Sequence, residues 1–109
     1  MKPIIWLGDT HRSVKDYPAN AKREIGYNLD KIQRGETPAD WKPMVGFEGG
    51  VKEIRIHLEN EYRVIYIAKY PEAIYVLHAF IKKTEKTSQR ELKIIQSRFS
   101  LLNTRRQLK

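Results

Sequence analysis

The sequence has no cysteine, no long apolar run and none of the short motifs that bind nucleotides. The lack of cysteine excludes disulfides and cysteine-ligated zinc sites. No apolar run approaches the ~20 residues that cross a bilayer, so no membrane-spanning segment is predicted. The apolar residues 3–7 are too few for a signal peptide, and we therefore expect a cytoplasmic protein.

Metal and cofactor motifs are missing as well. The three histidines, His11, His57 and His78, form no H-x₃-H pair and have no carboxylate cluster beside them in the sequence. A phosphate-cradling glycine loop, a dinucleotide fingerprint and a nucleophile elbow are all absent. We expect neither a metal nor an organic cofactor.

Basic residues exceed acidic ones, and most of the excess lies near the C-terminus. The 109 residues include 21 Lys and Arg against 13 Asp and Glu, a net charge of +8. Residues 81–109 hold 9 basic and 2 acidic side chains, and thus +7 of that charge. This asymmetry favours a polyanionic partner: nucleic acid first, then an anionic membrane or an acidic protein. The alternative is a basic tail that is merely solvated.

The first half of the chain predicts one strand, two helical segments and a long loop. Residues 3–7 are typical of a strand and residues 11–17 of a helical turn. Apolar residues recur at helical spacing through 18–34, and Gly35 follows where a helix favours a left-handed residue. Residues 35–50 are rich in Gly and Pro and predict a loop. We expect four of its apolar side chains to fold onto the core: Trp41, Met44, Val45 and Phe47.

The second half predicts three strands and a helix. Residues 51–58 alternate apolar and polar side chains, which is typical of a strand with one buried face. Residues 62–70 are rich in β-branched and aromatic residues and predict a strand covered on both faces. Residues 73–83 predict a third strand. The short turns between these strands favour an antiparallel meander.

The last element predicted is a helix over residues 88–102. It begins at Ser88-Gln89-Arg90-Glu91, which has the S-x-x-E form of a capping box. Residues 103–109 then predict a frayed basic tail.

These elements predict a single α+β domain over residues 1–109, in the order β-α-α-β-β-β-α. We expect the helices on one face of a mainly antiparallel sheet. The other face would then be free as a working surface.

The free face would present polar side chains at the end of the meander. Glu53, Arg55 and His57 alternate along one strand, Arg63 enters the next, and Lys82 leaves the third. Together they predict a cationic cluster around one carboxylate and one imidazole. RNA cleavage by 2′-hydroxyl attack needs a proton acceptor, a proton donor and cations, and no metal. The cluster could supply all three.

Each of these residues also has an ordinary structural interpretation. Glu53 could be a carboxylate paired with Arg55 or Arg63, and His57 an exposed strand histidine. His78 is interpreted as a half-buried, hydrogen-bonded residue, and His11 as surface. The meander tyrosines could stack on bases, but core packing is the favoured interpretation for most of them: Tyr62, Tyr66, Tyr70 and Tyr75.

Short motifs follow one another through the meander in a fixed order: Glu53-Ile54-Arg55, Tyr62-Arg63-Val64 and Leu77-His78-Ala79-Phe80-Ile81-Lys82-Lys83-Thr84-Glu85-Lys86-Thr87. Together with the L-x-x-I-Q-x-G-x-x-P sequence of residues 29–38, they resemble the RelE/HigB superfamily of toxins, and within it the phage-derived HigB-like branch. The resemblance covers about residues 20–100. It implies a RelE-like fold.

The resemblance also implies an activity and partners. Such toxins are metal-independent, ribosome-dependent mRNA endoribonucleases that occupy the A site beside 16S rRNA. They cut mRNA by 2′-oxygen attack and arrest translation. In HigB-like systems the antitoxin is usually a helix-turn-helix protein of the HigA type. By position, Arg55 and Arg63 match basic strand residues that contact the scissile phosphate, and Lys82, Lys83 and Lys86 match the basic segment after the third strand.

Two positions depart from the RelE pattern. Glu53 stands where RelE-type members carry a lysine, and residues 88–109 lack the family's last-helix tyrosine. We therefore hypothesise that Glu53 or His57 accepts the 2′ proton while Arg55, Arg63 and Lys82 stabilise the phosphorane. RNA and the ribosome would be bound by Lys83, Lys86, Arg90, Lys93, Arg105 and Arg106. The alternative is a non-catalytic inhibitor that binds RNA or a host protein, such as a phage host-inhibition protein.

Overall fold

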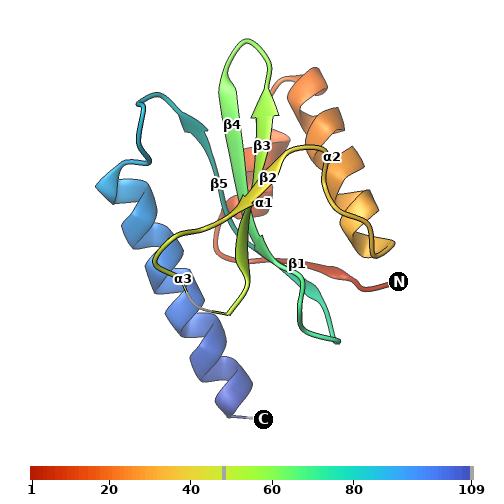
Figure 1. Cartoon of the computed structure of the whole chain (residues 1–109), viewed down its shortest axis with the longest axis vertical. Coiled ribbons are helices and arrows are strands. Elements are labelled where there is room, and N and C mark those ends of the chain that lie inside the picture. Colours follow the sequence, from red (N-terminus) through yellow and green to blue (C-terminus); the bar gives the residue numbers. More distant parts are fainter. Residues whose placement is uncertain (48, 109) are drawn as a thin grey trace.

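A computed structural model of the chain describes residues 1–47 and 49–108. It contains one five-stranded sheet and three helices (Figure 1). Their order and bounds are β1 (Ile4–Trp6), α1 (Thr10–Lys15), α2 (Ala19–Gln33), β2 (Trp41–Pro43), β3 (Val51–His57), β4 (Glu61–Ile67), β5 (Ile74–Lys82) and α3 (Gln89–Gln107). The α+β class is confirmed, and every predicted strand and helix is present with its ends within a few residues of the prediction, except that α3 continues beyond its predicted end at residue 102.

The sheet is mixed, with the order β1-β5-β4-β3-β2. β3, β4 and β5 form the predicted antiparallel meander, and β2 pairs antiparallel with β3 at one edge. β1 pairs parallel with β5 at the other edge. A bulge in the β4–β5 ladder leaves Leu77 without a partner, since Ile65 pairs with His78 and Tyr66 with Val76.

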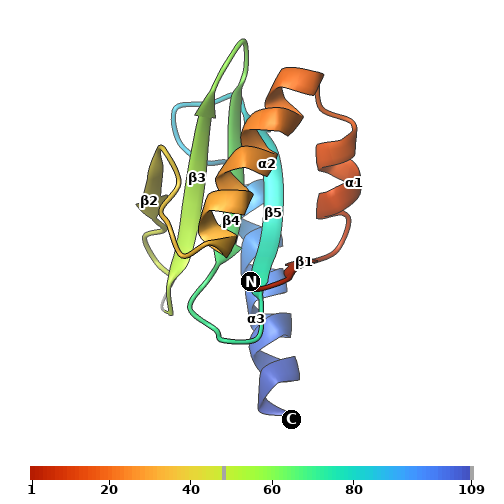
Figure 2. The same ribbon diagram turned by 90° about the vertical axis from the view of Figure 1, so that its right-hand side faces the viewer.

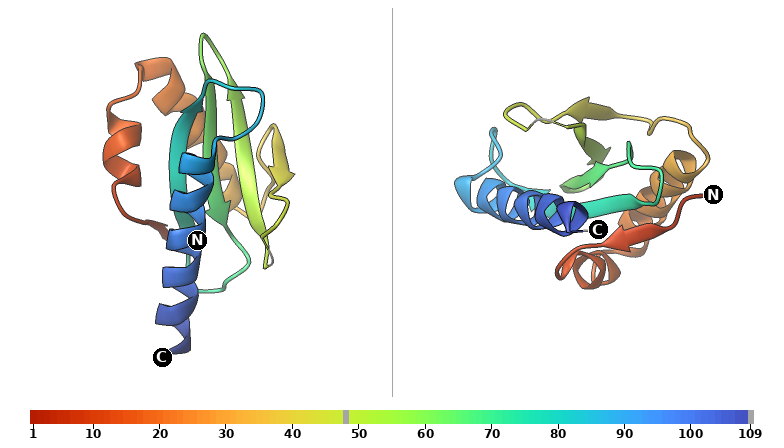
Figure 3. Two further views of the ribbon diagram at one scale, coloured as in Figure 1. Left: turned by 90° about the vertical axis from the view of Figure 1, so that its left-hand side faces the viewer. Right: turned by 90° about the horizontal axis from the view of Figure 1, so that it is seen from below.

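The helices cover both faces of the sheet, so the prediction that they share one face is wrong (Figures 2 and 3). Ile25 and Leu29 of α2 pack with Val64 of β4 in one core, whereas Ile95 of α3 packs with Ile65 in another. The reason lies in β4, whose residues are buried on both sides. A strand with two apolar faces needs a covering layer on each.

The segment before β3 differs from the predicted loop in two respects. Trp41–Pro43 forms the three-residue edge strand β2, where Pro43 is tolerated because an edge strand needs few ladder donors. Met44 and Phe47 pack partly against the core on the α3 side, as expected. Val45 does not: it is 96% exposed.

α3 runs to Gln107, so the expectation of a frayed tail from residue 103 is wrong over the residues that the structure describes. Leu102 is buried, and the Arg106 guanidinium lies 3.5 Å from the centre of the Tyr70 ring and pairs with Glu72. Basic side chains in a last turn also interact favourably with the helix dipole. Lys109 lies outside the described residues.

Gly35 ends α2 in the predicted way, with a φ of +81°. Its N–H donates to the Ile32 carbonyl at 3.0 Å, and the N–H of Glu36 donates to the Lys31 carbonyl at 2.9 Å. These two bonds form a Schellman motif, which requires a left-handed residue at this position.

Gly35→Ala should therefore lower the free energy of unfolding by about 1 kcal/mol, because alanine is strained at positive φ. Gly26→Ala, inside α2 with no described atom beyond the helix's own backbone within 4 Å of the added methyl, should raise it by about 0.5–1 kcal/mol. Urea unfolding of the two variants measures both. Equal effects of the same sign would contradict this account of the helix end.

Candidate functional site

The polar side chains of the meander gather on the α3 side of the sheet, where β3 ends and β4 begins. The register sets Arg55 directly opposite Arg63, and Arg63 opposite Phe80. Residues paired across an antiparallel ladder share a face, so the predicted proximity of Arg55 and Arg63 is confirmed. Phe80 belongs to the same core cluster as Ile95 of α3, so it lies between Arg63 and that helix.

Arg63 is the buried centre of this group, with 3% of its surface exposed. Its guanidinium donates to the Tyr62 carbonyl at 3.0 Å and to Glu61 at 3.1 Å, and Nε lies 3.8 Å from Glu53 Oε1. The structural interpretation of Glu53 as the partner of an arginine therefore fits. Its partner is Arg63.

Both ring nitrogens of His57 meet a carboxylate. Nε2 lies 2.6 Å from Asp40 Oδ2 and Nδ1 lies 2.7 Å from Glu61 Oε1. An imidazole can donate from both nitrogens only when it is protonated. The hydrogen bonds to Asp40 and then Glu61 accordingly raise the pKa of His57, and the bond to His57 lowers the pKa of Asp40.

The cluster is thus closer to charge balance than the sequence predicts. Asp40 arrives from the segment before β2, and Glu61 from the start of β4, to join Glu53. Three carboxylates, rather than one, face Arg55, Arg63 and His57.

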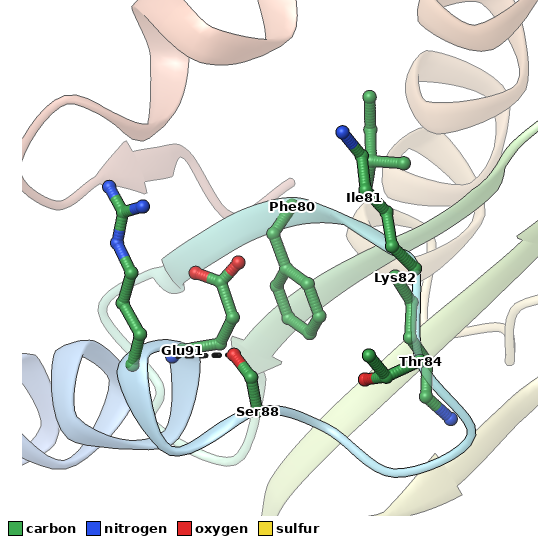
Figure 4. A pocket seen from close by; sticks show the side chains of 8 residues that line it. Phe80, Ile81, Lys82, Thr84, Ser88 and Glu91 are labelled. Atoms are coloured by element: carbon green, nitrogen blue, oxygen red, sulfur yellow. Dashed lines mark hydrogen bonds between the residues drawn. The ribbon is translucent and has the colours of Figure 1, made fainter.

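A pocket of about 170 Å³ lies beside this cluster, between the end of β5 and the start of α3 (Figure 4). The Phe80 ring and the Glu91 carboxylate face each other across it, and Ser88 lies at the turn into α3. The Glu91 N–H donates to Ser88 Oγ at 3.4 Å, which is the predicted N-cap bond. Five further residues complete the lining: Ile81, Lys82, Lys83, Thr84 and Arg90.

A chain of hydrogen bonds behind the pocket fixes the Glu91 carboxylate. His78, 7% exposed, donates from Nε2 to Glu91 Oε1 at 2.9 Å, while its Nδ1 lies 3.4 Å from Arg98 Nη1. Burial lowers the pKa of His78, which favours the neutral ring. Because the donor Arg98 Nη1 faces Nδ1, the ring proton is assigned to Nε2, which faces Glu91. The expected hydrogen bonding of His78 is confirmed, but the residue is buried rather than half-buried.

Arg98 anchors this chain to the rest of the fold. It donates to Thr10 Oγ1 at 2.8 Å, to the Leu77 carbonyl at 2.9 Å and to Asp9 Oδ1 at 2.7 Å. These bonds join α3 to β5 and to the start of α1. The hydrogen bond from Arg98 also lowers the pKa of Asp9.

A family model for the phage-derived protein Gp49-like (DUF891) matches residues 12–100. The chain belongs to this Gp49-like family, which is related to RelE toxins. No curated protein matches the sequence. In the described part of this Gp49-like protein, no helix is long and apolar enough to cross a membrane.

The predicted RNA-binding residues of the Gp49-like protein fall into two groups. Lys83 and Arg90 line the pocket, and Lys86 and Lys93 are exposed nearby in the turn and on α3. Arg105 and Arg106 lie at the far end of α3, about 22 Å along the helix axis from Arg90 at 1.5 Å per residue. The structure therefore does not bring all six together.

Sequence reasoning missed Glu91 and Arg98 as members of the site. Glu91 was interpreted only as part of a capping box. The seven-residue spacing of the two places them on one helix face, but this signal is weak without knowledge of which strand that face meets. Among residues 1–47 and 49–108, no three His, Asp or Glu side chains are arranged to hold a metal ion.

The two histidines should titrate on opposite sides of the ordinary value of about 6.5. His57 should remain protonated above it and His78 neutral below it. His57 thus stabilises the fold below pH ~6.5, and this contribution is lost as the pH rises through its raised pKa. His78 has the opposite sign, because its lowered pKa means that acid favours the unfolded chain.

NMR titration of the imidazole ring protons measures the two pKa values, and the variants His57→Gln and His78→Gln assign each signal to its histidine. In Asp40→Asn, the pKa of His57 should fall while that of His78 stays unchanged. A lower pKa for His57 than for His78 would contradict the geometry.

Proposed function

We propose that this Gp49-like protein is the toxin of a toxin–antitoxin system, of the HigB-like kind, and that it cleaves mRNA on the ribosome. Its family is toxin-like, which supports the first part. The proposed reaction is attack of a ribose 2′-oxygen on the adjacent phosphorus, with the 5′-oxygen as leaving group. It needs no metal.

One observation carries the proposal: two buried guanidinium nitrogens make no hydrogen bond, although one of them, Arg63 Nε, lies 3.8 Å from Glu53 Oε1. Nε of Arg55 and Nε of Arg63 have no hydrogen-bond acceptor among the described residues. A buried donor left unpaired costs about 1–3 kcal/mol, and a charged one costs more. Arginine binds phosphate through such donors, and the two lie opposite each other across β3 and β4. Arg55, which is only partly buried, is the one of the two that an RNA phosphate can reach directly; Arg63, with 3% of its surface exposed, would act on that phosphate through its charge.

The proton acceptor that the geometry favours is Glu91. Its carboxylate lines the pocket, and neutral His78 holds it in place from behind. His57 suits the role less, because both its nitrogens already donate to carboxylates. Glu53 lies against Arg63, where its charge is already paired.

In this proposal Glu91 takes the proton of the 2′-hydroxyl and Lys82, which lines the pocket from β5, gives one to the departing 5′-oxygen. The products are a 2′,3′-cyclic phosphate and a free 5′-hydroxyl. Arg55 and Arg63 stabilise the negative charge of the phosphorane.

The proposal extends to partners. Lys83 and Arg90 line the pocket, Lys86 and Lys93 are exposed in the turn before α3 and on α3, and such cations suit the phosphates of ribosomal RNA in the A site. A helix-turn-helix antitoxin encoded beside this protein would neutralise it.

Arg55→Ala should abolish growth arrest on induced expression in bacteria, together with new in-frame mRNA 5′ ends seen by primer extension. Arg55 suits the test better than Arg63, whose burial and three polar contacts make its loss a folding defect. The matched control is Arg23→Ala on the exposed side of α2, which should arrest growth like the wild type. Arrest without new ends would instead mean a non-catalytic inhibitor.

Glu91→Gln should lower the cleavage rate by about 10²–10⁴-fold while the protein still binds ribosomes, since general bases contribute factors of this size. The control is Glu85→Gln in the exposed turn nearby, which should cleave normally. Co-sedimentation with ribosomes and primer extension separate binding from cutting. If Glu53→Gln loses cleavage and Glu91→Gln keeps it, the acceptor is Glu53.

A further inference from the structure

β1 leaves one side of its backbone unpaired at the rim of the sheet. Its only neighbouring strand within the described residues is β5. The Ile74 N–H donates to the Pro3 carbonyl and the Leu7 N–H to the Val76 carbonyl, both at 2.9 Å. Backbone groups alternate in direction along a strand. The N–H and C=O groups of Ile4 and Trp6 therefore point away from β5, and we call this row the β1 edge.

An apolar groove flanks the β1 edge on each face of the sheet. On the α1–α2 side, a groove of about 270 Å³ is lined by Ile4 and Trp6 together with Val14, Ile25 and Leu29. Gly26 also lines this groove, and beyond the neighbouring backbone of α2 no described atom lies within 4 Å of where a side chain would begin.

On the α3 side, a groove of about 210 Å³ is lined by Ile5 and Leu7 together with Tyr75, Leu101 and Leu102. Ile5 is 40% exposed and Leu101 48%. Figure 3 shows β1 with α1 and α2 to one side of the sheet and α3 to the other. Alternate residues of β1 thus serve two grooves, and a strand added beside β1 would place its own alternate side chains in the same two grooves.

The charges around both grooves have one sign. Lys15 and Lys22 line the first groove, Arg105 and Arg106 line the second, and no Asp or Glu lines either within the described residues. Arg106 already pairs with Glu72. Lys15, Lys22 and Arg105 are exposed and form no ion pair with any described residue.

We propose that the β1 edge binds an extended segment of a partner protein, with three or four consecutive apolar residues flanked by Asp and Glu. The segment pairs with the Ile4 and Trp6 backbone, fills both grooves and meets Lys15, Lys22 and Arg105 with its carboxylates. A second copy of this chain fits poorly, because it would bring the same cations face to face. The proposal does not depend on RNA cleavage.

The test uses the full-length chain and a synthetic peptide, EDVLVED, with blocked ends. In Trp41→Phe, Trp6 is the only tryptophan, and its fluorescence should titrate with the peptide. Hydrogen exchange followed by NMR should show new protection of the Ile4 and Trp6 amides, whose N–H groups become paired only if the peptide adds as a strand. The peptide KKVLVKK should bind at least about tenfold more weakly.

Charge reversal distinguishes this site from attraction to the basic protein in general. Lys15→Glu with Lys22→Glu should weaken EDVLVED about tenfold, whereas Arg23→Glu, exposed on α2 but outside the groove lining, should change the affinity little. Binding without protection of the Ile4 and Trp6 amides overturns the proposal, as does no binding at all. Protection of these amides in the concentrated free protein also overturns it and assigns the edge to a second copy.

Discussion

The burial of β4 and β5 on both faces is the constraint on which the other features of this fold depend. A strand pair with apolar residues on both sides must be covered twice, so α1 and α2 pack on one face and α3 on the other. The candidate site is consequently confined to the part of the α3-side face of the sheet that α3 leaves uncovered. That is the end of the meander where Arg63 faces Phe80, beside the first turn of α3. The position of the site is therefore set by the division of the core between the two faces of the sheet and not by the polar residues of the site.

Arg98 converts this packing into a defined geometry. Apolar contacts alone would allow α3 to rotate or slide, but the guanidinium makes directional bonds to Leu77, Thr10 and Asp9. Because Leu77 lies at the β-bulge, the bulge and the helix are fixed together. His78, next in the chain, is thereby held with its Nε2 toward Glu91. Arg98 thus sets the tautomer of His78, and His78 in turn orients the carboxylate of Glu91, seven residues before Arg98 in the chain.

Much of this could be predicted from the sequence, and the failures have physical causes. The alternation over residues 51–57 located Glu53, Arg55 and His57 correctly, because a half-buried strand has period two. The interpretation of β4 as covered on both faces already required a helix on each side, yet local patterns do not say which helix meets which face. Asp40 joins the cluster through β2, a three-residue edge strand whose pairing is set by β3 rather than by its own residues, and Glu61 joins it from the start of β4. Glu91 was hidden because one residue can satisfy a helix start and a tertiary contact together.

The two histidines show why residue type alone does not assign chemistry here. His57 sits half-exposed between two carboxylates and is held as an imidazolium, a donor at both nitrogens. His78 is buried, has an arginine beside one nitrogen, and is held neutral as a donor to Glu91. Neither offers a free lone pair to a substrate proton. A carboxylate remains the group able to accept one, and of the carboxylates around the site, Glu53, Glu61 and Asp40 are each paired with a cation. In the proposed cleavage reaction Glu91, whose partner is a neutral ring, is therefore the carboxylate that would accept the substrate proton.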